Sequence, residues 1–148
     1  GKRDGLSTYR YNNGKKLGLG HYKDGLEDGR WTWWYKSEMK KSEEHYKDGK
    51  RDGLSTYWYE NGTRWYERHY KYGKKDGLDT EWYESGRKWY EIIFKDGKKD
   101  GLDTEWYSNG KKKVEKHYNN GLEEGRWTQW SKDGKKTYEG HFKDGNEQ

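Results

Sequence analysis

GLSTYWYENGTRWYERHYK, residues 53–71, decides the fold of this 148-residue chain. The first arm, residues 54–59, is rich in the aromatic and β-branched side chains that favour strands. Asn61-Gly62 follows, and this dipeptide is a strong signal for a type I′ hairpin turn, because both turn positions require positive φ. Residues 63–71 form the return arm. The stretch therefore predicts an antiparallel β-hairpin.

This hairpin is one unit of a repeat. Its opening glycine recurs every 24 residues, at Gly5, Gly29, Gly53, Gly77, Gly101 and Gly125. The units are 5–28, 29–52, 53–76, 77–100, 101–124 and 125–148, with residues 1–4 as the tail of a preceding unit. Because neither end carries a capping sequence, we expect a window from a longer array. The structural repeat residues of the third unit are Gly53, Thr56, Asn61, Gly62, Glu67, His69, Tyr70 and Gly73.

Composition narrows the architecture. Hydrophobic residues make up 26% of the chain and charged residues 40%. So few aliphatic side chains cannot form the closed core of a two-layer domain, whereas an aromatic content of 18% argues against disorder. We expect an all-β fold: an elongated, twisted, single-layer antiparallel meander of about twelve strands. With no cysteine, no signal peptide and no apolar run long enough to span a membrane, the sequence favours a cytoplasmic location.

Loop lengths predict which residues face each other across the strands. The connection at residues 96–99 fits a four-residue loop. In the third unit the expected pairs are Trp58 with Trp65, Thr56 with Glu67, and Leu54 with His69; across the next loop they are Trp65 with Trp82, Glu67 with Thr80, and His69 with Leu78. One face would then carry continuous rows of Leu/His, Thr/Glu and Trp. The other face would set Tyr70 over Gly53 and Gly77, and Tyr59 against Arg64.

The run from Tyr46 to Gly62, YKDGKRDGLSTYWYENG, alternates aromatics with glycine-rich turns and resembles the MORN repeat. It is most similar to a bacterial variant found in antitoxin and immunity-type proteins. The resemblance covers the whole chain and implies a non-enzymatic interaction or scaffolding module, in some members with phospholipid contacts. The chain departs from its own pattern at Glu38, which replaces a turn glycine, at residues 17–20, LGLG, and at Ile92-Ile93.

Ionisable residues form columns rather than a unique site. The five histidines share one repeat position, beside a column of glutamates. Successive histidines lie two strands apart, roughly 9.6 Å at normal strand spacing, which is too far for one metal ion with bonds of about 2 Å. We therefore expect no metal, no cofactor and no catalytic residues. Lysines and arginines alternate with acids in the loops, so nucleic acid, anionic lipid and carbohydrate are lesser alternatives for a ligand.

Tryptophan distinguishes the units from one another. Lys41 and Lys113 stand where the third and fourth units have Trp65 and Trp89. Because aromatic residues dominate interaction hot spots, we interpret the central tryptophans as a partner-binding ridge; stiffening of the sheet is the alternative. The expected ridge residues are Trp58, Trp65, Trp82, Trp89, Trp106 and Ile93. The leading hypothesis is a protein-binding module, and the resemblance implies a finer version of it, an antitoxin or immunity protein that occludes a toxin. The alternative is a structural array that joins end to end through its terminal strands into a filament or surface layer.

Overall fold

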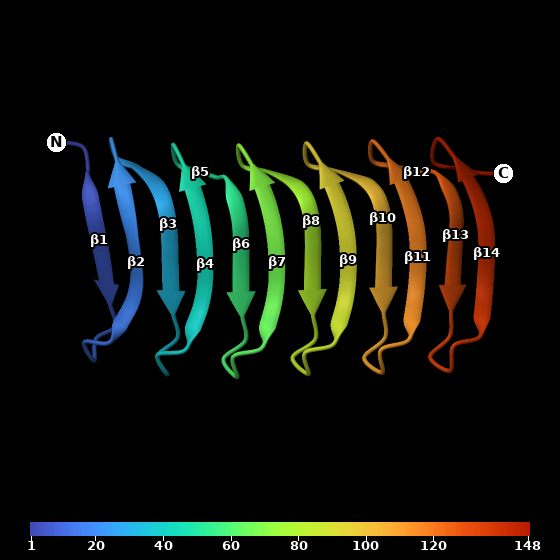
Figure 1. The fold of residues 1–148 in the computed structure, drawn as a ribbon, viewed down its shortest axis with the longest axis horizontal. Helices are drawn as coiled ribbons and strands as arrows, with labels where there is room; N and C mark the ends of the chain where they lie inside the picture. The colour runs from blue at the N-terminus through green and yellow to red at the C-terminus, as the bar shows by residue number, and fades with distance from the viewer.

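The computed structural model describes residues 1–148 and consists of one antiparallel sheet without helices (Figure 1). Its strands are β1 (Gly5–Arg10), β2 (Lys16–Lys23), β3 (Leu26–Trp34), β4 (Lys40–Lys47), β5 (Lys50–Arg51), β6 (Gly53–Trp58), β7 (Arg64–Lys71), β8 (Lys74–Trp82), β9 (Lys88–Lys95), β10 (Lys98–Trp106), β11 (Lys112–Asn119), β12 (Leu122–Glu123), β13 (Gly125–Trp130), β14 (Lys136–Lys143) and β15 (Asn146–Glu147). β5, β12 and β15 have two residues each, which leaves twelve longer strands in chain order. The expected single-layer meander is confirmed, and no helix that could span a membrane is present.

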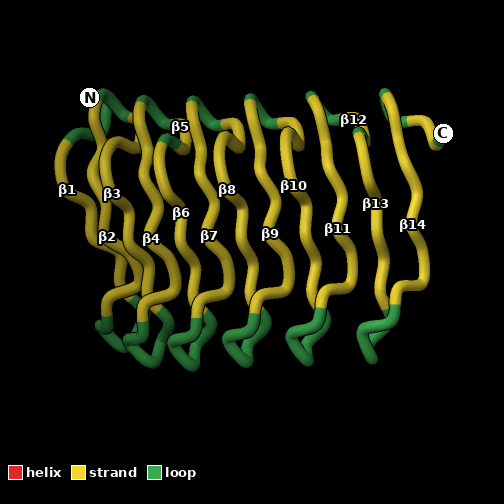
Figure 2. Tube along the Cα trace, turned by 45° about the vertical axis from the view of Figure 1, so that its right-hand side comes forward, coloured by secondary structure: helices red, strands yellow, loops and turns green.

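The wider loops at one end of the hairpins differ from the expected turn type (Figure 2). The Gly62 N–H donates to the Tyr59 carbonyl at 2.9 Å, and the Tyr59 N–H donates to the Thr63 carbonyl at 2.9 Å. Only Gly62, with φ of 86°, has positive φ within this loop. The loop is therefore a type I turn followed by a left-handed glycine, and the type I′ prediction for Asn61-Gly62 was wrong. The Asn61 side chain instead accepts the Thr63 N–H at 2.9 Å, as asparagine does in Asx turns.

Type I′ geometry occurs at the opposite end of the hairpins. Asp96 and Gly97 have φ of 49° and 85°, so both positions of a two-residue turn are left-handed. Lys98 and Lys99 already belong to β10. The four-residue loop expected over residues 96–99 was therefore wrong. Tyr72-Gly73 forms the equivalent turn in the third unit, although tyrosine has a Cβ that disfavours its φ of 50°.

Two irregularities in register correct the expected side-chain pairs. In the hairpin of β6 and β7, the pairs Gly53–Tyr70, Leu54–His69 and Thr56–Glu67 are confirmed. A bulge then pairs Trp58 with Arg64 and leaves Trp65 without a partner, so the pairing of Trp58 with Trp65 was wrong.

The pairs between β7 and β8 also differ from those expected. Their ladder begins at Tyr66–Glu81 and does not include the expected pair of Trp65 with Trp82. On the other side of β8, Trp82 pairs with Lys88. Between β7 and β8, Glu67 pairs with Thr80 as expected, but a further shift sets Tyr70 against Lys75 instead of Gly77. His69 has no paired residue in this shifted segment; its Nδ1 lies 3.0 Å from the Leu78 carbonyl oxygen.

The sheet has no apolar core. Only 16 of 148 residues are buried, and just two of these, Trp31 and Phe142, are hydrophobic. The two faces differ. The threonine face carries the buried row Thr32, Thr56, Thr80, Thr104 and Thr128, flanked by glutamates such as Glu43 and Glu67. The opposite face, called here the variable face, carries a recurring column of aromatic rings, while its other side chains differ among the units; they include Trp31, Glu44, Tyr57, Arg68 and Asp79.

Consecutive units are joined by a ladder of tyrosines. Each tyrosine just beyond the first long strand of a unit donates its hydroxyl to the carbonyl of the tryptophan 23 residues ahead. The pairs are Tyr11–Trp34 (2.8 Å), Tyr35–Trp58 (2.8 Å), Tyr59–Trp82 (3.0 Å), Tyr83–Trp106 (2.9 Å) and Tyr107–Trp130 (2.9 Å). The ladder therefore fixes the spacing of each hairpin relative to the next without requiring a hydrophobic layer.

The unusual run of residues 17–20 provides space for two tryptophans of the next strand. Gly18 pairs with Trp33 across β2 and β3. A Cβ on Gly18 would lie 2.4 Å from the Trp33 ring, and one on Gly20 would lie 2.0 Å from the Trp31 ring. Rings lying against bare backbone are a known way to cover strand glycines. The two glycines thus allow Trp31 to be 97% buried in a single-layer sheet (3% exposed).

We predict that Gly20→Ala destabilises the fold by about 1–3 kcal/mol, the usual cost of overpacking. The added Cβ would meet the Trp31 ring at 2.0 Å. Urea denaturation would measure the free energy of unfolding. The control is Trp31→Ser, since Ser7 and Ser55 occupy the same repeat position. In that background, Gly20→Ala should add little further cost; an equal cost in both backgrounds would contradict the steric account.

Candidate functional site

The expected ridge residues are divided between the two faces. Trp58, Trp82 and Trp106 lie on the threonine face, each beneath a basic side chain. The distances from cation to ring centroid are 5.2 Å for Lys40 over Trp58, 5.9 Å for Arg64 over Trp82 and 5.7 Å for Lys88 over Trp106. Trp34 and Trp130 are covered in the same way, by Lys16 and Lys112. Because the arrangement recurs in five hairpins, it is a regular feature of the sheet.

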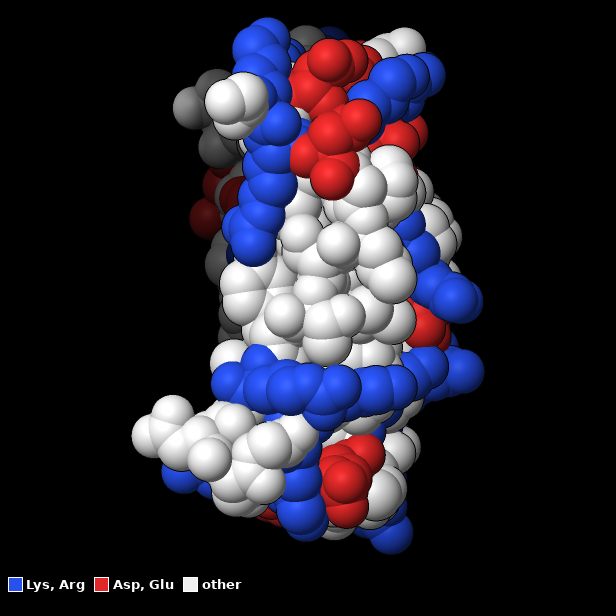
Figure 3. Space-filling model, turned by 90° about the vertical axis from the view of Figure 1, so that its left-hand side faces the viewer, with Lys and Arg blue, Asp and Glu red and all other residues white.

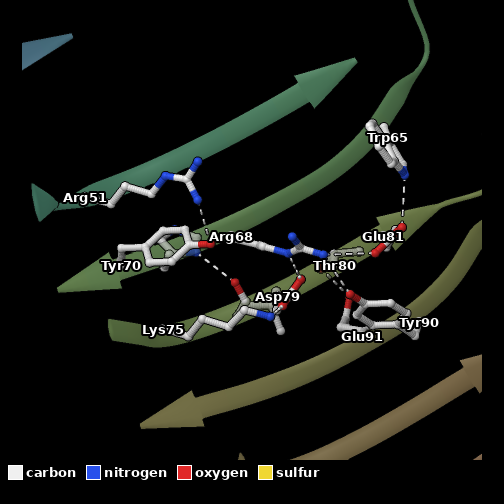
Figure 4. Close-up of polar contacts among 12 residues, drawn as sticks. Arg51, Trp65, Arg68, Tyr70, Lys75, Asp79, Thr80, Glu81, Tyr90 and Glu91 are labelled. Carbon is white, nitrogen blue, oxygen red and sulfur yellow. Dashed lines mark hydrogen bonds and ion pairs between the residues drawn. The ribbon is translucent and has the colours of Figure 1, made fainter. Parts of the chain in front are cut away.

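Trp65 and Trp89 lie on the variable face instead. The Trp65 indole N–H donates to Glu81 Oε1 at 3.0 Å (Figure 4). Glu81 pairs with Tyr66, and adjacent strand residues point to opposite faces, so Glu81 and Trp82 are on different sides. The bulge at Trp65 therefore separates the predicted ridge into two groups. The central tryptophans do not form one continuous row.

The two tryptophans have similar surroundings. The Trp65 ring centroid lies 5.6 Å from that of Tyr59, and the Trp89 centroid lies 5.8 Å from that of Tyr83. Tyr59 thus packs on Trp65 rather than on Arg64, which corrects the expected cation–π pair. Both tryptophans remain accessible, at 37% and 40% exposure respectively.

Ile92 and Ile93 lie on opposite faces, as the sequence predicts. Ile93 pairs with Leu78 on the threonine face, and both are 40% exposed. Ile92 pairs with Asp79 on the variable face. The pair Leu78–Ile93 therefore forms a small apolar spot at the position where the neighbouring units have histidine.

Buried charge organises the centre of the variable face. Glu44 is 3% exposed, and its carboxylate accepts hydrogen bonds from the Tyr57 hydroxyl at 2.5 Å, the Tyr46 hydroxyl at 2.9 Å and Arg51 Nε at 2.8 Å. A buried carboxylate is tolerated when it is paired and hydrogen-bonded in this way. The Tyr57 ring in turn stacks on Tyr66, with centroids 4.3 Å apart.

A second network continues across the next hairpin (Figure 4). Arg68 donates to Asp79 Oδ1, Glu81 Oε2 and the Tyr90 hydroxyl, each at 3.1 Å. Lys75 Nζ lies 2.5 Å from the other oxygen of Asp79, which is only 1% exposed. Each network uses side chains from adjacent hairpins, so the variable face is rigid and polar around its aromatic rings.

Burial raises the pKa of several tyrosines on this face. Desolvation is the largest cause for Tyr57, and its hydrogen bond to the Glu44 carboxylate raises the pKa further. The pKa of Tyr90 is also raised by burial and by its proximity to Glu81. Burial likewise raises the pKa of Tyr46 and Tyr66. These phenols therefore remain protonated, and serve as hydrogen-bond donors, well above neutral pH.

Two histidines of the repeated column lie within hydrogen-bonding distance of backbone carbonyl oxygens. His45 Nδ1 and His69 Nδ1 lie 2.9 Å and 3.0 Å from the carbonyl oxygens of Leu54 and Leu78, respectively. No three His, Asp or Glu side chains gather closely enough to hold a metal ion. At the N-terminal end of the sheet, basic and acidic side chains lie together beside an uncharged patch (Figure 3).

Sequence reasoning missed most of the variable face. The predicted rows were built from the residues that recur, so they did not include Tyr57, Arg68, Asp79 and Glu81. Their signal was nevertheless available. They occupy strand positions that alternate with the threonine row, where the residue type varies among the units, although Asp79 and Glu81 recur as Asp103 and Glu105.

The open array of repeated hairpins defines the class of protein as a β-repeat module. The chain belongs to the MORN repeat variant family, whose repeat matches residues 3–24, 27–48, 51–72, 99–120 and 123–144. Repeats of this family are typically non-catalytic modules for binding or scaffolding. The unmatched interval 73–98 contains Ile92-Ile93. No curated protein matches the chain.

We predict that the protein loses stability as the pH rises above about 10. The ordinary tyrosine pKa is about 10, and the fold raises that of Tyr57 by keeping the phenol buried beside Glu44. The stabilising difference is fully present below the unfolded pKa and is lost as pH rises through the folded pKa. The melting temperature should therefore be lower at pH 11 than at pH 8, by less in Tyr57→Phe. Tyrosine absorbance at 295 nm would contradict the prediction if all phenols ionised at their ordinary pKa in the folded state.

Proposed function

We propose that the chain is a protein-binding module that contacts its partner through the variable face. The observation that carries this proposal is the different behaviour of the two faces. The threonine face repeats one arrangement in unit after unit. On the variable face a column of aromatic rings recurs, but other side chains differ among the hairpins, and exposed Trp65 and Trp89 occur in only two of them. A repeated surface stabilises the sheet, while a surface with unique features can distinguish one partner from another.

The proposed surface also has the physical properties of a hot spot. Its aromatic rings are held in place by neighbouring rings and by Glu81, so little side-chain entropy would be lost on binding. Charged residues at its centre are already paired within the chain. The family resemblance to antitoxin and immunity-type proteins suggests a finer version, in which the partner is a toxin and the sheet blocks it by occlusion.

We predict that changing both Trp65 and Trp89 to lysine weakens partner binding at least about thirtyfold without unfolding the protein. Lys41 and Lys113 already occupy the equivalent positions in other units, so the fold accommodates lysine there. Peptides selected from a displayed library on the wild-type chain would serve as the probe, with affinities measured by calorimetry. Circular dichroism would confirm the fold.

Ile93→His is the matched control, because the neighbouring units have histidine at that position. It alters the threonine face and should leave peptide affinity unchanged. The reverse pattern, with Ile93→His reducing affinity and the double tryptophan variant retaining it, would assign binding to the threonine face. A loss of melting temperature with unchanged affinity in the double variant would show that Trp65 and Trp89 are structural.

End-to-end assembly is the second candidate, favoured by the edges of the sheet. β15 pairs with β14 as β5 pairs with β4, so the segment at this edge already begins the hydrogen bonding of a further hairpin. β1 pairs only with β2 and leaves its other edge open. Exposed strand edges favour addition of another strand.

We predict that this 148-residue chain associates at high concentration through β1 and β14–β15. Replacing Thr8 in β1 with proline would remove its backbone N–H and reduce the association constant measured by sedimentation equilibrium. The equivalent change at Thr80, inside the sheet, would unfold a strand and serves as the contrast. Monomeric wild-type protein at millimolar concentration would exclude this assembly.

A further inference from the structure

A cavity of about 220 Å³ opens on the variable face near the N-terminal end of the sheet. It is lined by Tyr9, Tyr22, Glu27, Trp31, Trp33 and Tyr46. The rings contact one another closely: the Trp33 centroid is 5.6 Å from Tyr9 and 5.9 Å from Trp31, and Tyr22 meets Trp31 edge-on at 5.0 Å. Glu27 is the single charged residue of the lining. The cavity therefore combines several aromatic rings with one carboxylate.

Comparison of the units shows which residue type usually occupies the position of Glu27. At intervals of 24 residues the equivalents of Glu27 include Arg3, Arg51, Lys75 and Lys99. Each of these cations lies over the aromatic ring 19 residues ahead, at 4.7 Å for Arg3 over Tyr22, 5.3 Å for Arg51 over Tyr70, 4.7 Å for Lys75 over Phe94 and 4.7 Å for Lys99 over Tyr118. At the end of the first unit Glu27 replaces the cation, and no basic group covers the corresponding ring of Tyr46.

The fifth unit repeats the same replacement and contains its own cation. The segment 26–32, LEDGRWT, recurs as LEEGRWT at 122–128, so Glu123 is equivalent to Glu27 and Trp127 to Trp31. Lys116 Nζ lies 2.9 Å from Glu123 Oε1 and 3.9 Å from the centroid of the Trp127 ring. The carboxylate and the indole thus hold an ammonium group between them.

The first copy lacks this ammonium group. The residue equivalent to Lys116 is Gly20, which has no side chain and lies against the Trp31 ring. The Glu27 carboxylate makes no ion pair or hydrogen bond, in contrast to that of Glu123. Arg3 does lie on two of these rings: it covers Tyr22 and Tyr9 and donates to the Tyr9 hydroxyl at 2.9 Å, but it does not pair with Glu27.

We propose that this cavity binds a lysine side chain of a protein partner, with the ammonium group against Glu27 and the aromatic rings. Cation–π attraction and one carboxylate are the chemistry that such a site provides, and Lys116 shows the same chemistry fulfilled inside the chain. The cavity adjoins a second hollow of about 340 Å³ that shares Trp33 and Tyr46 and continues toward Tyr57. A peptide segment on either side of the lysine therefore has room along the variable face. This inference rests on the proposed function only for the partner being a protein.

The test uses a small probe, so that it does not depend on identifying the partner. N-acetyl-lysine methylamide would be titrated into the folded chain while NMR follows the indole N–H signals of the tryptophans. We expect saturable shifts at Trp31 and Trp33 in the millimolar range, which is typical of a single exposed cation–π contact and ion pair. The neutral analogue N-acetyl-norleucine methylamide should cause no saturable shift.

Three variants make the result specific. Glu27→Gln should weaken probe binding about three- to tenfold, whereas Glu123→Gln should leave it unchanged at Trp31 and Trp33. Lys116→Ala vacates the second copy and should add a saturable shift at Trp127. Absence of a saturable shift in the wild type, equal binding of the norleucine probe, insensitivity to Glu27→Gln, or no new site in a folded Lys116→Ala protein would each overturn the proposal. None of these outcomes bears on the peptide affinity measured for the Trp65 and Trp89 variants, so the two proposals fail separately.

Discussion

Hydrogen bonding from each hairpin to the next is the interaction on which this structure depends. A single-layer sheet has no second layer against which to bury apolar surface, and only Trp31 and Phe142 are buried hydrophobic residues. Backbone pairs supply one set of links between hairpins, and the tyrosine hydroxyls that reach tryptophan carbonyls 23 residues ahead supply another. Backbone and hydroxyl groups need hydrogen-bond partners. These partners lie one unit ahead along the chain, so the bonds require a constant unit length of 24 residues.

The two faces use the same strands for different purposes. On the threonine face the rows of threonine, glutamate and cation-covered tryptophan recur along the sheet, and each pair contributes a small amount to stability. On the variable face buried ions such as Glu44 and Asp79 are satisfied by residues of the neighbouring hairpin. Those contacts leave some rings exposed and others around a hollow, and such a surface can recognise a specific partner without a catalytic site.

Variation among near-identical units provides an internal comparison. Lys41 and Lys113 mark the positions of Trp65 and Trp89 as tolerant of different side chains, so tryptophan there is not required by the hairpin itself. Similarly, the segments 26–32 and 122–128 differ in whether the preceding strand provides a cation, Lys116, or a glycine, Gly20. The fold stays the same in both cases, which separates the residues that build the sheet from those that give each region its chemistry.

The sequence by itself determined the hairpin, the period, the single-layer sheet and the pairs nearest the strand centres, such as Thr56–Glu67, because these follow from side-chain alternation and recurring glycine. It did not determine the turn type at Asn61-Gly62. Asparagine can adopt the positive φ of a type I′ turn, but its side chain can also stabilise a type I turn, and the second arrangement is the one found here. Only the tertiary structure showed that a bulge leaves Trp65 unpaired and moves it away from Trp58 to the variable face. One extra residue in a strand reverses the side-chain direction beyond it, and that choice depends on contacts with Glu81 and Tyr59 in other strands and loops. For the same reason the cavity around Glu27 could not be predicted from the sequence: its walls come from four strands and depend on two glycines making room for the rings of their neighbours.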